Sequence, residues 1–231
     1  KFILLLICFC FFVFILLTDS RNAILGLLIS TPIVLKTSFL LWYIPLMIIC
    51  FLSLAIAVVP IFPNSLQTLM RSIIPSRIYT LFPEIGFSNL TSYPRINKWY
   101  AALGFIIDKP IFGWGATTFP IIYKLKTDGA WFGHTHNLPL EVAVSYGLIA
   151  SLLIFSTYIA LLFLSFKEIF KSEKFTSNKN IYIYQKAWWA SSFIFFVSHL
   201  SDVQYFDGRI SIVCWILLAG LRTTLKEKVN Q

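Results

Sequence analysis

The sequence predicts an all-α integral membrane protein with about six transmembrane helices and one long external loop. Of its 231 residues, 58% are hydrophobic and only 13% are charged. A soluble protein of this length cannot cover so large an apolar fraction with a polar surface. The apolar residues also gather in separate runs, and a run of ~20 residues is what a helix needs to cross a bilayer core of ~30 Å.

Each apolar run is interpreted as one span. The runs cover residues 2–18, 22–35, 38–60, 138–166, 187–205 and 210–222. The chain then divides into residues 1–60 with the first spans, residues 61–137 as an external loop that contains His134 and His136, and residues 138–231 with the last spans and a cytoplasmic tail.

The N-terminal run has the features of a span rather than of a signal peptide. It begins directly after Lys1 and lacks a small-residue cleavage site. Because no methionine precedes it, we expect the sequence to be the C-terminal portion of a longer protein. The four cysteines lie inside apolar runs, where a thiol behaves as a small hydrophobe, so we expect packing residues and no disulfides. They are Cys8, Cys10, Cys50 and Cys214.

The basic residues indicate membrane topology rather than a nucleic-acid partner. The net charge is +9, but the lysines and arginines are spread over short segments instead of forming one basic face. Segment 167–186 and the tail after residue 222 are rich in lysine, which predicts that both are cytoplasmic and that 61–137 faces outward. The external loop also contains basic residues, but loops beyond ~60 residues translocate largely regardless of charge.

Most of the arginines fall on the predicted outer side, while the inner loop uses lysine. The outer arginines are Arg21, Arg71, Arg77, Arg95 and Arg209. A guanidinium fork suits bidentate recognition of phosphate, so this distribution indicates a phosphate-bearing ligand. A chance distribution, or simple anchoring to lipid headgroups, is the alternative.

The external loop is expected to contain two helices. Residues 64–74 place apolar side chains at helical spacing opposite polar ones, which is typical of a helix lying in the membrane interface. Residues 97–109 form a second helical pattern, ended by Pro110 and a turn at Gly113-Trp114-Gly115. No strand is predicted before this G-x-G, so it does not indicate nucleotide binding.

The segment from Gly133 to Asn137 brings a histidine to the start of the fourth span. Asn137 or Leu138 is the predicted N-cap, and His136 then lies at the positive end of the helix dipole, which disfavours imidazolium. A neutral imidazole can act as a general base. The alternative is a histidine that only completes the cap, and Glu141 is interpreted as a helix-start residue.

A metal site is not predicted. His134 and His136 resemble a ligand pair, but the sequence nearby offers no cysteine or carboxylate cluster as further ligands. We expect the side chain of His134 to point away from that of His136.

Ionisable residues also crowd the outer end of the fifth span, namely His199, Asp202, Asp207 and Arg209. Such groups at membrane depth are costly and indicate a function. A pair between Asp202 and Arg209 that holds the turn is the structural alternative.

Four stretches of the chain together resemble the O-antigen ligase and polymerase family of membrane glycosyltransferases. In chain order they are Thr18 to Ala23 (T-x-S-R-x-A), Arg95 to Phe119 (R-x-x-x-W, then D-x-P-x-x-G-x-G and F), His136 to Gly147 (H-N, E and G), and His199 to Arg209. The chain departs from the family in having fewer spans and in carrying Ala150 where a second glycine is common.

The resemblance implies a GT-C-like architecture and a place in lipopolysaccharide biosynthesis in the bacterial inner membrane. The donor would be a polyprenyl (undecaprenyl) diphosphate-linked glycan, and the acceptor a lipid A-core or another glycan. The reaction would take place on the periplasmic side, without metal, nucleotide or other cofactor, and would invert the anomeric centre.

The same resemblance implies roles for individual residues. His136 would be the catalytic base, and Arg95 together with Arg21 would stabilise charge on the departing diphosphate. Asp202 and Arg209 would help to bind substrate. An inorganic carbon or other small-solute transporter and a non-enzymatic membrane scaffold remain the alternative functions.

Overall fold

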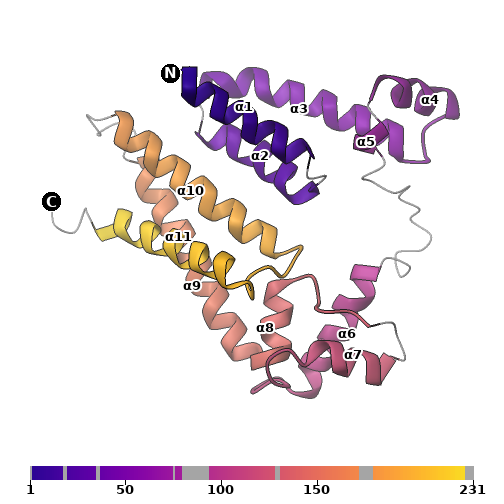
Figure 1. The fold of residues 1–231 in the computed structure, drawn as a ribbon, viewed down its shortest axis with the longest axis vertical. Coiled ribbons are helices and arrows are strands. Elements are labelled where there is room, and N and C mark those ends of the chain that lie inside the picture. The colour runs from indigo at the N-terminus through magenta and orange to yellow at the C-terminus, as the bar shows by residue number, and fades with distance from the viewer. Residues whose placement is uncertain are drawn as a thin grey trace. The chain divides into compact units, whose positions relative to one another are not determined.

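The computed structural model describes residues 2–17, 20–34, 37–74, 76–79, 94–127, 131–171 and 179–226. All regular structure in these residues is helical, which confirms the all-α class. The chain forms two compact units, Lys1–Leu90 and Thr91–Gln231 (Figure 1). Of the described cysteines, Cys214 is buried, while Cys10 and Cys50 are exposed, and all three are free thiols.

The first unit contains α1 (Phe2–Leu17), α2 (Arg21–Val34), α3 (Thr37–Val58), α4 (Asn64–Ile73) and α5 (Ser76–Tyr79). The Tyr43 hydroxyl of α3 donates a hydrogen bond of 2.6 Å to the carbonyl of Leu28 in α2. In α3 the window Leu41–Val58 is long and apolar enough to cross a membrane.

Helix α4 is amphipathic, as its sequence pattern predicts. Its polar side anchors the end of α3, because the Gln67 amide donates to the carbonyls of Val59 and Phe62 and the Arg71 guanidinium donates to that of Ala57. The Ala57 carbonyl lies in the last turn of α3, where carbonyls lack partners within the helix. The apolar side chains of α4 remain exposed, namely Leu66, Leu69 and Ile73.

The second unit contains α6 (Pro94–Asp108), α7 (Phe119–Thr127), α8 (Leu138–Tyr146), α9 (Leu148–Lys171), α10 (Lys179–His199) and α11 (Gly208–Lys226). Helices α9, α10 and α11 pack against one another. The Trp189 indole of α10 donates to the Leu162 carbonyl of α9 at 2.8 Å, and the Trp188 indole donates to the Leu217 carbonyl of α11 at 2.9 Å. These two indole N–H groups therefore find partners within the unit, as a lipid environment requires.

Within the described residues, three helices are long and apolar enough to cross a membrane, and they include the windows Leu41–Val58, Leu148–Phe170 and Gly208–Leu225. Large apolar side chains on these windows are exposed, which suits contact with lipid. The six-span count stays a prediction.

Two predicted boundaries are wrong. The run 138–166 is not one helix, because it breaks at Gly147 into α8 and α9. The predicted span 187–205 is shifted, because α10 begins at Lys179 and ends at His199. The exposed Tyr184 suits a helix that extends beyond the apolar run, because a tyrosine presents an apolar body together with a polar end.

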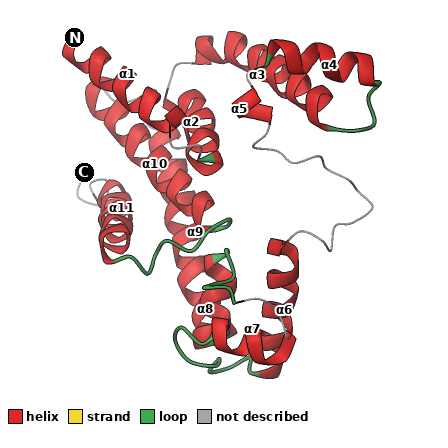
Figure 2. Cartoon of the chain, turned by 45° about the vertical axis from the view of Figure 1, so that its right-hand side comes forward, coloured by secondary structure: helices red, strands yellow, loops and turns green. Residues whose placement is uncertain are grey.

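Helices α6, α7 and α8 gather at one end of α9 (Figure 2). They share a core in which α6 and α7 pack on α8; its buried members are Ala102, Phe105, Ile106, Phe119, Ile122, Tyr123, Ala143 and Val144. The loop between α6 and α7 docks on the end of α8, because the backbone N–H groups of Trp114 and Gly115 donate to the carbonyls of Val144 and Ser145.

Glycine is required where this loop meets the junction of α8 and α9. Gly113 and Gly147 have φ values of +66° and +91°, which side chains rarely adopt. A Cβ on Gly147 would lie 1.9 Å from the carbonyl oxygen of Ile111. The break in the predicted long helix therefore results from a tertiary contact with the D-x-P-x-x-G-x-G loop.

Candidate functional site

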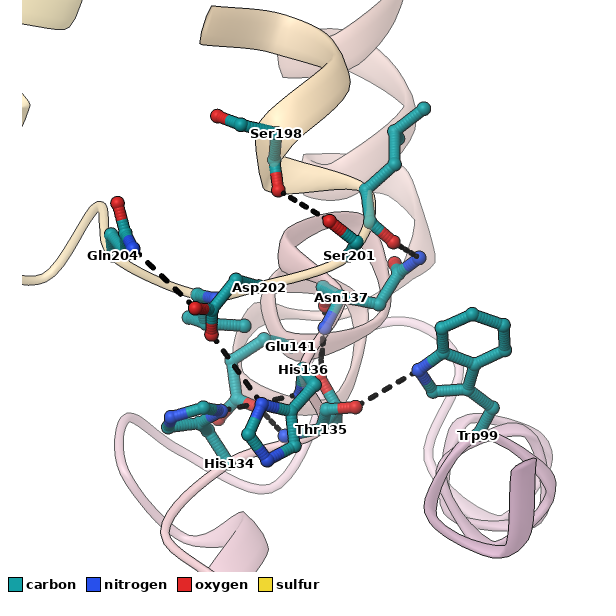
Figure 3. A network of polar contacts seen from close by, with 12 residues as sticks. Trp99, His134, Thr135, His136, Asn137, Glu141, Ser198, Ser201, Asp202 and Gln204 are labelled. Atoms are coloured by element: carbon teal, nitrogen blue, oxygen red, sulfur yellow. Dashed lines mark hydrogen bonds and ion pairs between the residues drawn. The ribbon is translucent and has the colours of Figure 1, made fainter. Parts of the chain in front are cut away.

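The histidine segment, Gly133 to Asn137, lies between α7 and α8 and ends in the predicted N-cap of α8. Asn137 is the N-cap of α8, since its side-chain oxygen accepts from the Leu140 N–H at 3.0 Å. Its side-chain amide donates to the Leu200 carbonyl at 2.9 Å, in the loop between α10 and α11. Asn137 therefore joins the helix start to the loop that carries Asp202 (Figure 3).

Two side chains fix the backbone of Thr135. The Trp99 indole of α6 donates to the Thr135 carbonyl at 3.0 Å, and the Glu141 carboxylate of α8 accepts from the Thr135 N–H at 2.9 Å. Glu141 is only 2% exposed. Its role is therefore to hold the histidine segment, beyond the helix-start role that its position in the sequence predicts.

His136 faces Asp202 across the site. Its Nδ1 lies 3.4 Å from Asp202 Oδ1, and both side chains are about one third exposed or less. Asp202 is itself held in place, because Oδ1 accepts from the Val203 N–H at 2.8 Å and the Gln204 amide donates to Oδ2. A carboxylate at Nδ1 favours the tautomer with the proton on Nδ1, which leaves the Nε2 lone pair free.

The environment of His136 favours the neutral imidazole. Burial, then the neighbouring charges of His134 and Lys98, lower the pKa of His136, while Asp202 acts in the opposite direction. Burial raises the pKa of Asp202, but the hydrogen bonds from Val203 and His136 outweigh it, so that this pKa lies below its usual range. At neutral pH the pair is thus an ionised carboxylate beside a neutral imidazole.

The expectation that His134 points away from His136 is wrong. The two rings meet edge to face with centroids 4.2 Å apart, and His134 Nδ1 accepts from the backbone N–H of His136 at 3.2 Å. His136 has a φ of +56°, a left-handed conformation that turns its ring toward His134 and Asp202.

The same three residues provide the nearest approach to a metal site in the described part of the chain. One ligand atom each of His134, His136 and Asp202 lies within 4.8 Å of the others. The sequence reasoning missed Asp202 as a potential third ligand, because it lies more than sixty residues beyond the histidines. The geometry would accommodate a cation that prefers nitrogen and oxygen ligands.

The predicted arginines occupy different parts of the chain. Arg95 is exposed on the first turn of α6, one turn before Trp99. Arg209 is paired with Asp207, with Nη2 and Oδ2 2.8 Å apart, so the alternative Asp202–Arg209 pair is wrong. Arg21 is the first residue of α2 in the other compact unit.

Lys98 is a site residue that the sequence reasoning missed. It is only 3% exposed and its ammonium lies 3.7 Å from the centroid of the Phe132 ring, next to the histidine segment. Its helical spacing could have predicted the burial, because Lys98 lies one turn before Ala102 and two turns before Phe105 on the buried face of α6.

Comparison with known proteins places the chain in a family. Residues 6–155 match the family described as O-antigen ligase, which is well over half of the sequence. The match includes Arg21, Arg95 and His136 and ends before Asp202 and Arg209. No curated protein and no solved structure matches the chain significantly. The protein, with its helices long and apolar enough to cross a membrane and its histidine segment at the start of α8, therefore belongs to the O-antigen ligase family.

Proposed function

We propose that the protein transfers a glycan from a polyprenyl diphosphate onto a hydroxyl of a lipid A-core or of another glycan, at the outer face of the bacterial inner membrane. Membership of the O-antigen ligase family supports this class of reaction. The observation that carries the mechanism is the contact between His136 and Asp202, because it presents a neutral imidazole with a free Nε2.

His136 acts as the general base. Its Nε2 takes the proton of the acceptor hydroxyl as the hydroxyl oxygen attacks the anomeric carbon. The bond between that carbon and the diphosphate oxygen breaks, and the electron pair leaves with the polyprenyl diphosphate. Attack opposite the leaving group inverts the anomeric centre. Asp202 stabilises the imidazolium that forms, as carboxylates do beside catalytic histidines.

Arginines stabilise the departing diphosphate. Arg95 stands at the start of α6, whose Trp99 is bonded to the histidine segment, and it is exposed to a ligand. A guanidinium offers two parallel donors to phosphate oxygens as negative charge develops there. Arg21 is proposed to share this role and Arg209 to contact the glycan.

The base is tested with His136→Asn and His136→Ala in membranes supplied with donor and acceptor. Asparagine tolerates a left-handed backbone and so retains the segment without the imidazole. Both variants should insert normally and lose transfer by about 10²–10⁴-fold, the usual contribution of a general base. Lys124→Ala, an exposed change on α7, is the matched control and should transfer at the normal rate.

A chelator separates this mechanism from a metal-dependent one. EDTA should leave the wild-type rate unchanged if His136 works as a base. Loss of transfer in EDTA, with recovery on adding a divalent cation, would instead assign His134, His136 and Asp202 to a metal.

The acceptor is identified from the glycan ladders of a deletion strain. Undecorated core in that strain indicates that the protein is a ligase, and core bearing a single repeat indicates that it is a polymerase.

A further inference from the structure

Lys98 is a buried cation, and its ammonium has no carboxylate partner among the residues that the structure describes. It is 3% exposed, although lysine is almost never fully buried unless it is paired. Within the described residues no carboxylate lies at salt-bridge distance from it, whereas Lys126 on α7 pairs with Asp108. Its neighbours are the Phe132 ring, at 3.7 Å, and the positive charge of Arg95 one turn earlier.

This arrangement is costly in the free protein. A cation–π contact offsets only part of the desolvation of an ammonium, and Arg95 adds repulsion. Burial and then Arg95 accordingly lower the pKa of Lys98. An apolar side chain at this position would continue the buried face of α6 that Ala102 and Phe105 occupy. A ligand that brings negative charge would remove the penalty.

Lys98 lies beside the candidate site. Trp99, the next residue, donates to the Thr135 carbonyl, and Phe132 precedes His134 by two residues. The charge of Lys98 also acts on His136. Arg95 and Lys98 are three residues apart on α6 and so stand on one face of the helix, with the larger guanidinium exposed and the ammonium inside.

We propose that Lys98 binds a phosphate group of the donor's diphosphate, beneath Arg95, and so is a second cation of the leaving-group subsite on α6. The proposal rests on the proposed function. An ammonium is a compact point charge that binds phosphate without fixing its orientation, whereas a guanidinium fixes the orientation of the phosphate through two parallel donors. Arg95 thus orients the diphosphate, and Lys98 supplies charge at its buried end.

The test measures binding of inorganic pyrophosphate to purified protein in neutral detergent. Lys98→Met keeps the length of the side chain but removes its charge. The affinity of this variant for pyrophosphate should fall by about tenfold or more, because a charge-assisted contact is lost. Lys98→Arg should keep most of the affinity. Without ligand, Lys98→Met should melt at a higher temperature than the wild type, because an unpaired buried charge has been removed.

Lys109→Met is the matched control. Lys109 also lies over an aromatic ring, 4.1 Å from the centroid of Trp114, but it is exposed. Its removal should leave pyrophosphate affinity unchanged. Equal affinity in Lys98→Met and the wild type would overturn the proposal, and so would a lower melting temperature without loss of affinity, because Lys98 would then only pack against Phe132.

Phosphatidylglycerol distinguishes the donor diphosphate from a lipid headgroup. Phosphatidylglycerol added at the same concentration as pyrophosphate should not displace pyrophosphate from the wild-type protein. Displacement would overturn the assignment of Lys98 to the donor diphosphate. Because no glycan is transferred in this experiment, a loss of binding in Lys98→Met supports Lys98 even if the transfer reaction fails its own test. Unchanged binding removes Lys98 from the site even if transfer is confirmed.

Discussion

At the residue scale, His136 is held by one contact from a distant part of the chain and by one local contact. Its carboxylate partner follows α10, and its backbone N–H is bonded to His134. The left-handed φ of +56° is a conformation that is uncommon outside glycine and costs free energy. The surrounding bonds to Thr135 and Asn137 offset that cost and keep the imidazole in one orientation.

The pH dependence of transfer should report the pKa of His136. A general base works only when it is neutral, and burial lowers the pKa of His136, so the midpoint of the decline in kcat/KM with falling pH should lie below the usual imidazole pKa of 6.5. In Asp202→Asn the partner that raises the pKa is lost, so the decline should move to still lower pH, with a lower plateau rate. A decline centred above 6.5 in the wild type would contradict the assignment.

Arg95→Lys tests whether the guanidinium acts through its geometry. The variant retains the charge but loses the bidentate fork, so transfer should fall by about tenfold or more even though electrostatic attraction remains. Arg21→Lys should behave in the same way. The measurement is the initial rate of glycan transfer at saturating donor, and wild-type rates in both variants would reassign these arginines to headgroup anchoring.

The sequence predicts those parts of the site that depend on local structure. Asn137 is recognisable as a cap because capping needs only a polar side chain before an apolar helix with an early proline. The contact of His136 with Asp202 is not recognisable, because the loop after α10 approaches α8 only in the folded bundle. Lys98 was missed for a related reason, since burial of a lysine runs against its usual preference.

At the scale of elements, the junction between α8 and α9 is the feature that the hydrophobic pattern conceals. The apolar run is continuous through Gly147, so periodicity predicts one helix. The break depends on the α6–α7 loop, whose Pro110 carbonyl accepts from the Leu148 N–H at 2.7 Å. Helices α4 and α6 were predictable within a few residues because polar and apolar positions alternate at helical spacing within each of them.

Gly147→Ala should destabilise the second unit by ~2 kcal/mol or more, because the new methyl group would collide with the Ile111 carbonyl and the backbone would be strained. Thermal unfolding in detergent, followed by tryptophan fluorescence, measures the change. Gly104→Ala is the control, since nothing lies within 4 Å of its Cβ and it stands inside α6. It should stabilise by about 0.5–1 kcal/mol. Equal stability of the two variants would refute the close approach.

At the scale of the whole molecule, charge and hydropathy define a membrane protein with a predicted outward face. Segment 167–186 and the C-terminal tail contain the lysine-rich stretches that are typical of cytoplasmic segments. Helices α6, α7 and α8 would then lie on the outer side together with the histidine segment. The reaction needs this orientation, because the proposed acceptor is outside.

Cysteine labelling on intact cells tests the orientation. In a variant without native cysteines, Asn97→Cys on α6 should react with an impermeant maleimide, and Lys167→Cys near the end of α9 should react only after the membrane is permeabilised. Both positions are exposed, so burial does not limit labelling. Protection of Asn97→Cys in intact cells would exclude the proposed periplasmic site.

The bonds to Thr135 also bear on engineering of this protein. The histidine segment belongs to no helix, and its backbone is held by side chains of two helices, Trp99 from α6 and Glu141 from α8. A chimera that transplants residues 134–137 into another membrane scaffold would therefore lose the shape of the loop while keeping its histidines. Trp99 and Glu141 must be transplanted with it.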